Sequence, residues 1–325
     1  MTKLAGTVVV VDDLEANLDL FVRLLTRDGY TVYGASDGLA ALDLVMRHHP
    51  DLVLSDVMMP KLDGFELCRR IKAEKATRLT PVVLVTSLAE REDRIRGINA
   101  GADDFLTKPV NAHELQARVR SLVRLKRYTD DLDSAESVIL SLGLTVESRD
   151  PSTGGHCERM AAYAATFGAH LGLGAEEIAA LHRGGYLHDV GKVGIPDAIL
   201  LKPSPLTPDE RTVMETHTVV GDSLCGNLRM LRLVRPIVRH HHEHLDGTGY
   251  PDGLSGDAVP LLAQVMSIVD IFDAMTTDRV YRKALTAEDA YRELQVAVAR
   301  GWQSARLVDA FISMCRSGRL GAASL

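Results

Sequence analysis

The stretch Arg239–Pro251 reads R-H-H-H-E-H-L-D-G-T-G-Y-P and contains four of the twelve histidines of this 325-residue chain. Neutral imidazole is a nitrogen ligand suited to iron, manganese, zinc or nickel, and carboxylates complete such sites. Two glycines and a proline follow at once, which predicts a tight loop whose backbone can approach a ligand closely. One or two of these histidines alone would indicate only a solvated surface, but the adjoining loop favours a metal site.

The region around this stretch, from about residue 140 to the end, has helical patterning. Ala-rich and Leu-rich segments are separated by Gly and Pro, which predicts an all-α bundle with polar sites between facing helices. We expect helices over the following segments: Glu158–Gly172, Ala175–Leu187, Asp209–His217 and Ala287–Arg300, with the helical pattern around His217 continuing to Val220.

Further candidate ligands lie in these helices. L-H-D-V-G-K places His188 beside Asp189, with Lys192 one turn later. Adjacent side chains on a helix diverge by roughly 100°, so both serve one site only if Asp189 bridges two metals or the helix ends there. His217 lies within the expected helix Asp209–Val220. Asp270 lies in an apolar run, where a buried carboxylate needs a metal, an Arg or a backbone cap as partner.

Residues 1–125 show a different pattern, in which short apolar runs alternate with helical segments. The expected strands are Thr7–Val11, Thr31–Ala35, Leu52–Ser55, Val82–Thr86 and Asp104–Leu106. The expected helices are Glu15–Asp28, Gly38–His48, Gly64–Lys72 and Glu90–Ala100. This alternation predicts a five-stranded parallel α/β sheet, with a ligand site at the carboxyl ends of its strands.

Polar residues follow those strand ends: Asp12, Asp13, Asp56, Thr86 and Lys108. Three converging carboxylates repel one another unless a hard cation such as Mg²⁺ neutralises them. An ammonium group and a hydroxyl group suit a phosphoryl group. Turn and capping aspartates are the alternative for any one of these residues, but their joint occurrence at one edge disfavours it.

Residues 1–125 resemble the receiver domain of response regulators, through the motifs V-D-D, S-D-V-M-M-P-K-L-D-G, V-T-S and L-T-K-P. The resemblance implies a flavodoxin-like fold, with Asp56 as the phospho-acceptor and a sensor histidine kinase as the phosphodonor. It also implies Mg²⁺ placed by Asp12 and Asp13. Three further residues would contact the phosphoryl group or act as the switch aromatic: Thr86, Lys108 and Phe105.

A connector follows at 126–145, and the second domain spans 146–325. Asn111, with Glu114 three residues later, predicts the start of a helix that continues into the connector. Such a helix is either a spacer or a pairing surface for a second copy in a homodimer. The apolar repeat weakens at Thr129–Asp133, so a sustained coiled coil is not specified.

The second domain resembles HD-GYP domains, the cyclic di-GMP phosphodiesterase branch of the HD superfamily. The matching motifs are E-S-R-D-P-S-T-G-G-H, H-D-V-G-K, H-H-E-H-L-D-G-T-G-Y-P and D-I-F-D-A-M-T-T-D-R-V-Y-R. The resemblance implies a centre of two divalent transition metals, with iron or manganese favoured over nickel, zinc or cobalt, and Asp189 bridging. The implied ligands are His188, Asp189, His217, His241, His242 and Asp270.

The same resemblance implies how the dinucleotide is held. Lys192 would contact a phosphate oxygen or the bridging water, and His156 would either support the metal ligands without binding a metal or lie on the substrate side. The other implied contacts are Tyr250, Arg279 and Arg282. Ser152 stands where some relatives carry a Glu that supports a third metal, and because Ser is a weak ligand we predict two metals.

The composition limits the alternatives. The net charge of −7 argues against a DNA-binding output, and no apolar run reaches the ~18 residues that a membrane span needs, so a cytoplasmic location is expected. The favoured function is a response regulator that hydrolyses cyclic di-GMP to the linear dinucleotide or GMP. Alternatives are hydrolysis of another nucleotide, or a catalytically silent module that binds cyclic di-GMP or a partner, for which a GGDEF-type protein is one candidate.

Overall fold

The computed structural model describes residues 6–87, 91–149, 155–226, 228–278 and 283–318. The chain forms two compact units, Met1–Ala135 and Glu136–Leu325. The division falls inside the helix α5 (Ala112–Glu147), so this helix contributes its first part to one unit and its last part to the other.

The first unit is built on a parallel sheet with the strand order β2-β1-β3-β4-β5. Its strands are β1 (Thr7–Val11), β2 (Thr31–Ala35), β3 (Leu52–Asp56), β4 (Val82–Thr86) and β5 (Asp104–Thr107). Its other helices are α1 (Glu15–Arg27), α2 (Gly38–His48), α3 (Gly64–Ala73) and α4 (Arg91–Asn99). The predicted five-stranded parallel α/β fold is confirmed, and the third and fifth strands each extend one residue further than expected, to Asp56 and Thr107.

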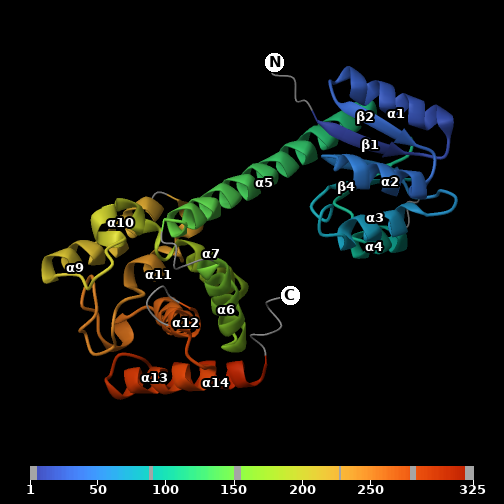
Figure 1. The fold of residues 1–325 in the computed structure, drawn as a ribbon. Helices are drawn as coiled ribbons and strands as arrows, with labels where there is room; N and C mark the ends of the chain where they lie inside the picture. Colours follow the sequence, from blue (N-terminus) through green and yellow to red (C-terminus); the bar gives the residue numbers. More distant parts are fainter. Residues whose placement is uncertain (1–5, 88–90, 150–154, 227, 279–282, 319–325) are drawn as a thin grey trace. The chain divides into compact units, whose positions relative to one another are not determined.

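Helices cover both faces of this sheet (Figure 1). On one face, Phe21 of α1 and Leu115 of α5 pack against alternate residues of β1, such as Val8. On the other face, Val45 of α2 and Phe65 of α3 complete a second apolar cluster. Strands buried on both faces read as continuous apolar runs, which is why the sequence indicated them well.

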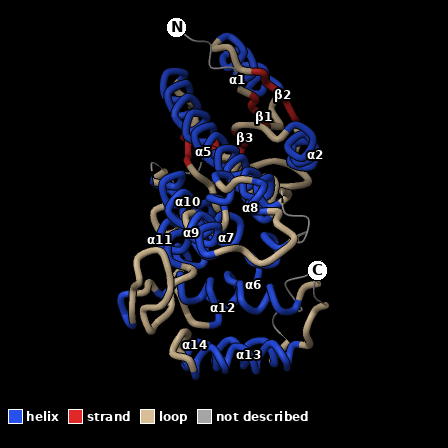
Figure 2. Tube along the Cα trace, turned by 60° about the vertical axis from the view of Figure 1, so that its left-hand side comes forward, coloured by secondary structure: helices blue, strands red, loops and turns tan. Residues whose placement is uncertain are grey.

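The second unit is helical, as predicted, and Figure 2 shows strands only in the first unit. Its elements are α6 (His156–His170), α7 (Ala175–Leu187), η1 (Val190–Gly194), α8 (Asp197–Leu200), α9 (Pro208–Glu215), α10 (His217–Cys225), η2 (Arg229–Leu231), α11 (Arg235–His240), η3 (Gly256–Ala258), α12 (Leu261–Thr276), α13 (Ala287–Ala299) and α14 (Ala305–Arg316). The apolar cluster at its centre includes Phe167, Met266 and Phe311, from three different helices.

One helix prediction was wrong. The segment Asp209–Val220 is not a single helix, because α9 ends at Glu215 and α10 begins at His217. At the junction, both the amide and the hydroxyl of Thr216 donate to the carbonyl of Val213, three residues back, which interrupts the regular i→i−4 ladder. The interruption places His217 in the first turn of a new helix.

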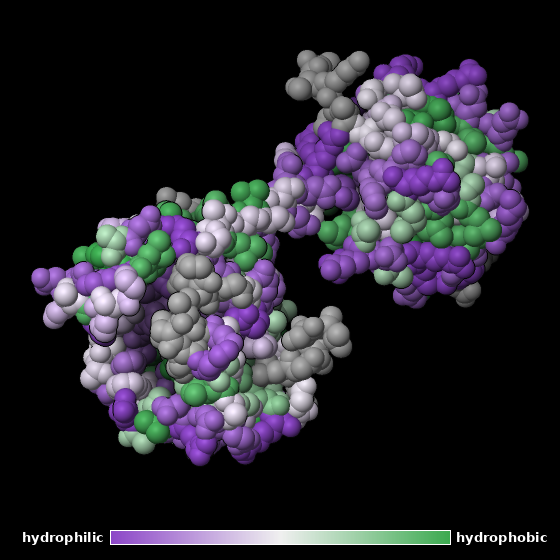
Figure 3. Space-filling model, in the orientation of Figure 1, coloured by the Kyte–Doolittle hydropathy of each residue, from purple (hydrophilic) through white to green (hydrophobic). Residues whose placement is uncertain are grey.

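Hydrophilic residues cover much of the visible face of each unit, with hydrophobic residues between them (Figure 3). Among the described helices, none is both long and apolar enough to cross a membrane.

Candidate metal centre and phospho-acceptor site

A helix end sets the position of His188 and Asp189. The helix α7 ends at Leu187, and Asp189, with φ −101° and ψ 7°, starts the short 3₁₀ segment η1. Gly191 lets η1 approach α10, because a Cβ atom at this position would lie 1.8 Å from the carbonyl oxygen of His217. The L-H-D-V-G-K sequence therefore ends one helix and brings two adjacent polar side chains against the start of another.

One group of possible ligands consists of Asp189, His217, His241 and His242, whose ligand atoms lie within 4.8 Å of one another. Asp189 Oδ1 lies 3.3 Å from Nε2 of His217 and 3.9 Å from Nε2 of His241. These three atoms are buried and have no hydrogen-bond partner among the described residues. Buried polar atoms without partners are costly, so this donor set fits a bound cation.

The opposite ring nitrogens of these histidines are fixed by the backbone. Nδ1 of His217 lies 2.8 Å from the carbonyl oxygen of Met214, and Nδ1 of His241 lies 3.0 Å from that of Val238. An Nδ1–H that donates to a carbonyl leaves the Nε2 lone pair available, which is the usual arrangement of a metal-binding histidine.

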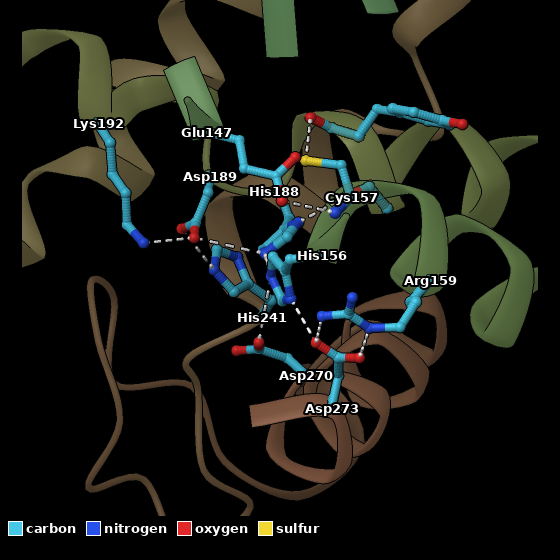
Figure 4. A network of polar contacts seen from close by, with 12 residues as sticks. Glu147, His156, Cys157, Arg159, His188, Asp189, Lys192, His241, Asp270 and Asp273 are labelled. Atoms are coloured by element: carbon cyan, nitrogen blue, oxygen red, sulfur yellow. Dashed lines mark hydrogen bonds and ion pairs between the residues drawn. The ribbon is translucent and has the colours of Figure 1, made fainter. Parts of the chain in front are cut away.

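A second group consists of His156, His188 and Asp270, and it adjoins the first (Figure 4). Nε2 of His156 lies 3.4 Å from Nε2 of His188 and 3.8 Å from Oδ1 of Asp270. Oδ2 of Asp189 lies 3.5 Å from Nε2 of His188, while Oδ1 faces the first group. A carboxylate shared in this way can bridge two cations. His156 lies with these ligand candidates; the sequence suggested that it either supports the metal ligands or lies on the substrate side.

Burial favours the neutral form of three of these imidazoles. It lowers the pKa of His188, brings that of His242 to about 4, and holds that of His241 well below its ordinary value. Burial alone would raise the pKa of Asp189, but Lys192 and the adjacent histidines outweigh it and hold this pKa well below the ordinary range. The site therefore combines neutral nitrogen donors with an ionised carboxylate.

Lys192 and Tyr250 border this centre. Lys192 Nζ donates to Oδ2 of Asp189 at 2.5 Å. Tyr250 stacks on His242 with ring centroids 4.8 Å apart, and its amide donates to the carbonyl of His242. Gly249 permits this fold-back, because a Cβ atom there would lie 2.3 Å from the amide nitrogen of His244. The Gly-rich loop thus closes over the histidines that precede it.

Glu243 fixes the same loop, a role that the sequence did not predict. Its buried carboxylate accepts hydrogen bonds from the amides of Asp252 and Leu254 at 2.8 and 3.0 Å. The side chain of His240 is only 14% exposed. It is covered because it lies between Glu243 and Asp252.

Asp273 and Arg159 were also missed. Asp273 Oδ2 lies 2.7 Å from Nδ1 of His156, and both Asp273 oxygens accept from the Arg159 guanidinium at 2.6 and 3.0 Å. Burial alone would lower the pKa of His156, but Asp273 and Asp270 raise it. Asp273 orients the imidazole of His156. The repeat D-I-F-D, with two aspartates one helical turn apart, was the available signal.

Of the remaining predicted residues, Arg279, Arg282 and Ser152 lie outside the described residues.

The first unit gathers Asp12, Asp13 and Asp56 at the carboxyl end of its sheet, with ligand oxygens within 4.8 Å. Lys108 Nζ donates to Asp12 at 3.1 Å and to Asp56 at 2.8 Å. Burial raises the pKa of Asp56, and the adjacent Lys108 offsets only part of this effect. Thr86 is buried at the end of β4.

Phe105 lies on the neighbouring strand β5, next to the strand that carries Thr86. Its ring packs against Gly97 of α4, where a Cβ atom would lie 2.4 Å from the ring. The guanidinium of Arg94 lies 5.9 Å from the ring centroid. The aromatic side chain therefore contacts the helix that follows the Thr86 strand.

Comparisons with known proteins agree with this division. A response regulator receiver domain model matches residues 8–120, and an HD domain model matches residues 144–302. RpfG, the cyclic di-GMP phosphodiesterase response regulator of Xanthomonas campestris pv. campestris, is 34% identical over 329 residues, which cover 94% of this chain and 86% of RpfG. A cyclic di-GMP phosphodiesterase of Thermotoga maritima is 32% identical over 336 residues, covering 95% and 90%.

A partial relative is the 3′3′-cGAMP-specific phosphodiesterase 3 of Vibrio cholerae, 33% identical over 183 residues, covering 56% of this chain and 40% of that protein. A receiver followed by an HD domain defines a response regulator whose output domain is of the hydrolase type. The chain belongs to the family of cyclic di-GMP phosphodiesterase response regulators.

Proposed function

We propose that this response regulator hydrolyses cyclic di-GMP at a dinuclear metal centre. One observation carries the proposal: Asp189 lies between two groups of histidine and carboxylate ligand atoms, with Oδ1 in the first group and Oδ2 3.5 Å from His188 of the second, and three of these buried atoms have no hydrogen-bond partner among the described residues. Two divalent ions bound there would supply an activated water and stabilise both the attacking and the leaving oxygen of a phosphodiester.

The protein side chains around the centre have separate roles in this proposal. Asp189 would help to hold the ions, and Lys192, which donates a hydrogen bond to Asp189, would stabilise a phosphate oxygen as negative charge builds up. Tyr250 offers an aromatic face beside His242 for a guanine base. Arg279 and Arg282 remain proposed phosphate contacts from the sequence resemblance alone.

The proposed metals are iron or manganese, with nickel, zinc or cobalt as alternatives, because histidine–carboxylate sites accept each of them according to availability. We keep the prediction of two ions. The position of His156 Nε2, 3.8 Å from Asp270, supports His156 as a direct ligand rather than a substrate contact.

Regulation is proposed to start at Asp56. A sensor histidine kinase would phosphorylate Asp56 with Mg²⁺ held by Asp12 and Asp13, and Lys108 would then move from Asp56 to the phosphoryl group. Phosphorylation acts by changing the relative stability of two arrangements. The helix α5, which includes the proposed connector 126–145, is the continuous element that can carry this change.

The same proposal includes two candidate protein partners. A second copy can pair along α5, where Leu125, Tyr128 and Leu132 are exposed at helical spacing. A GGDEF-type protein remains a candidate partner. These contacts would operate even if the module were catalytically silent.

A second candidate substrate is a different cyclic dinucleotide, since a 3′3′-cGAMP-specific phosphodiesterase aligns with this chain at 33% identity. A substrate panel distinguishes them: cyclic di-GMP, 3′3′-cGAMP and a linear dinucleotide are incubated with the metal-loaded full chain. Our proposal expects the highest kcat/KM with cyclic di-GMP. A higher kcat/KM with 3′3′-cGAMP would assign the second substrate.

A further inference from the structure

The helical unit has a hollow that is lined by arginines and lies apart from the two groups of candidate metal ligands. It lies along α10, η2 and α11 and has a volume of about 570 Å³. Its lining residues are Asp222, Gly226, Leu228, Arg229, Arg232, Arg235, Pro236, Arg239 and His240. A volume of this size falls within the range of small-molecule sites. None of the proposed metal ligands lines it, so it is a separate feature of this unit.

The charge of the hollow is opposite to that of the chain. Four guanidinium groups face it and only one carboxylate, that of Asp222, whereas the whole chain carries a net charge of −7. Guanidinium groups concentrated in a concave surface raise the local positive potential and attract anions. The composition of the lining therefore indicates an anionic ligand.

Two of the arginines are held in place by carboxylates. Asp222 accepts from Nε of Arg235 at 2.8 Å and lies 3.5 Å from Nη1 of Arg239. Arg239 also donates twice to Asp252, each time at 2.7 Å. These ion pairs order one wall of the hollow before any ligand binds, which lowers the entropic cost of binding.

The other two arginines are free to bind. Arg229 and Arg232 are exposed, and within the described parts of the chain neither forms an ion pair or a side-chain hydrogen bond. Exposed arginines without carboxylate partners keep all their donors available, and a guanidinium group matches a phosphate group through two parallel hydrogen bonds.

We propose that this arginine-lined hollow is a second, non-catalytic binding site for a small phosphorylated nucleotide, whose phosphate is held by Arg229 and Arg232. Phosphate is favoured over carboxylate because several guanidinium groups converge. A nucleotide is favoured over inorganic phosphate because the volume of the hollow exceeds that of a bare anion. The inference does not depend on which cyclic dinucleotide is hydrolysed. Arg239 links the hollow to the loop that contains Tyr250, through its ion pair with Asp252.

The test is isothermal titration calorimetry of the metal-loaded full chain with GMP, inorganic phosphate and guanosine in separate runs. The variant R229Q/R232Q removes the two unpaired guanidinium groups. The variant R120Q/R124Q is the matched control, because it removes two exposed arginines one helical turn apart on α5. Metal content and hydrolysis are measured on the same samples, so a failure of the proposed phosphodiesterase is recorded separately.

We expect a GMP-binding event that weakens at least about tenfold in Kd in R229Q/R232Q and is unchanged in R120Q/R124Q, with equal metal content in all three proteins. Guanosine, which lacks the phosphate, should not produce this event. The proposal is overturned if GMP binds all three proteins alike, if GMP does not bind, or if guanosine binds as tightly as GMP. Equal affinity for inorganic phosphate would overturn the assignment of a nucleotide.

Discussion

The acidic site of the receiver and the histidine site of the HD domain differ in how their ligand atoms are satisfied. In the receiver, Lys108 donates to both Asp12 and Asp56, and Asn17 donates to Asp12. In the HD domain, Asp189 Oδ1 and Nε2 of His217 lie 3.3 Å apart, and neither atom forms a hydrogen bond among the described residues. The carboxylates of the first site are therefore satisfied by side-chain donors, while the second site keeps buried ligand atoms without hydrogen bonds.

This difference suits the two chemistries. A receiver must bind and release Mg²⁺ and a phosphoryl group repeatedly, and oxygen ligands near the surface permit exchange. The proposed hydrolytic centre would have to keep its ions through each turnover, and buried imidazoles oriented by backbone carbonyls are suited to retain them. The next four predictions test this comparison.

The largest effect is expected from H188A/D189A. Removing Asp189 takes away the carboxylate shared by both ligand groups, so bound metal and hydrolysis should fall to background while far-UV circular dichroism stays helical. The control is H170A/D309A, which changes the same residue types outside both groups. Full metal content in H188A/D189A would contradict the assigned centre.

Asp56→Asn should abolish labelling by acetyl phosphate, because the amide is not a nucleophile for phosphoryl transfer. Metal content of the HD domain should not change. Asp43→Asn, on the exposed face of α2, is the control and should label normally. Labelling of Asp56→Asn at the wild-type level would refute the acceptor assignment.

Removal of metal by a chelator should increase hydrogen exchange near the histidine site but not near the acidic site of the receiver. An ion present at about 100 times its Kd stabilises the folded state by about 2.7 kcal/mol. Its removal therefore raises the equilibrium constant for opening of the site by about 100-fold. Hydrogen exchange of Val190–Gly194 and Arg235–His240 should accelerate by up to this factor when metal is removed. Exchange in β1 and β3 should stay unchanged. Equal acceleration in both units would remove the distinction drawn here.

The smallest effect is expected from Asp273→Asn. The amide would weaken the hold on His156 Nδ1 and break the charge pairing with Arg159, which should lower metal affinity or turnover by about 10- to 100-fold. Asp309→Asn, an exposed position on α14, is the control. Unchanged metal affinity and turnover in Asp273→Asn would show that Asp273 only supports packing.

The sequence indicated the strands better than the helix ends. β1, β2 and β4 have their predicted bounds, because each is a short apolar run between turn residues. The break at Thr216 accompanies two hydrogen bonds from this residue to the carbonyl of Val213, and helical periodicity alone does not reveal it. The close approach of α10 to η1 joins segments that no local pattern relates.

The sequence identified those site residues that lie in recognisable motifs. The roles of these residues in metal binding stay predictions. His188, His241 and Asp270 belong to recognisable patterns, and the structure brings each into one of the two groups. The pair Arg159–Asp273 joins α6 and α12 across 114 positions, so no local spacing reveals it. Such supporting contacts are visible only in three dimensions.

The most direct test of the dinuclear centre is anaerobic hydrolysis of cyclic di-GMP, with metal counted on the same sample. We predict turnover with about two transition-metal ions per chain, because two ligand groups share Asp189. An absence of both metal and turnover, even after reconstitution with iron or manganese and phosphorylation of Asp56, would contradict the proposal and favour a binding module.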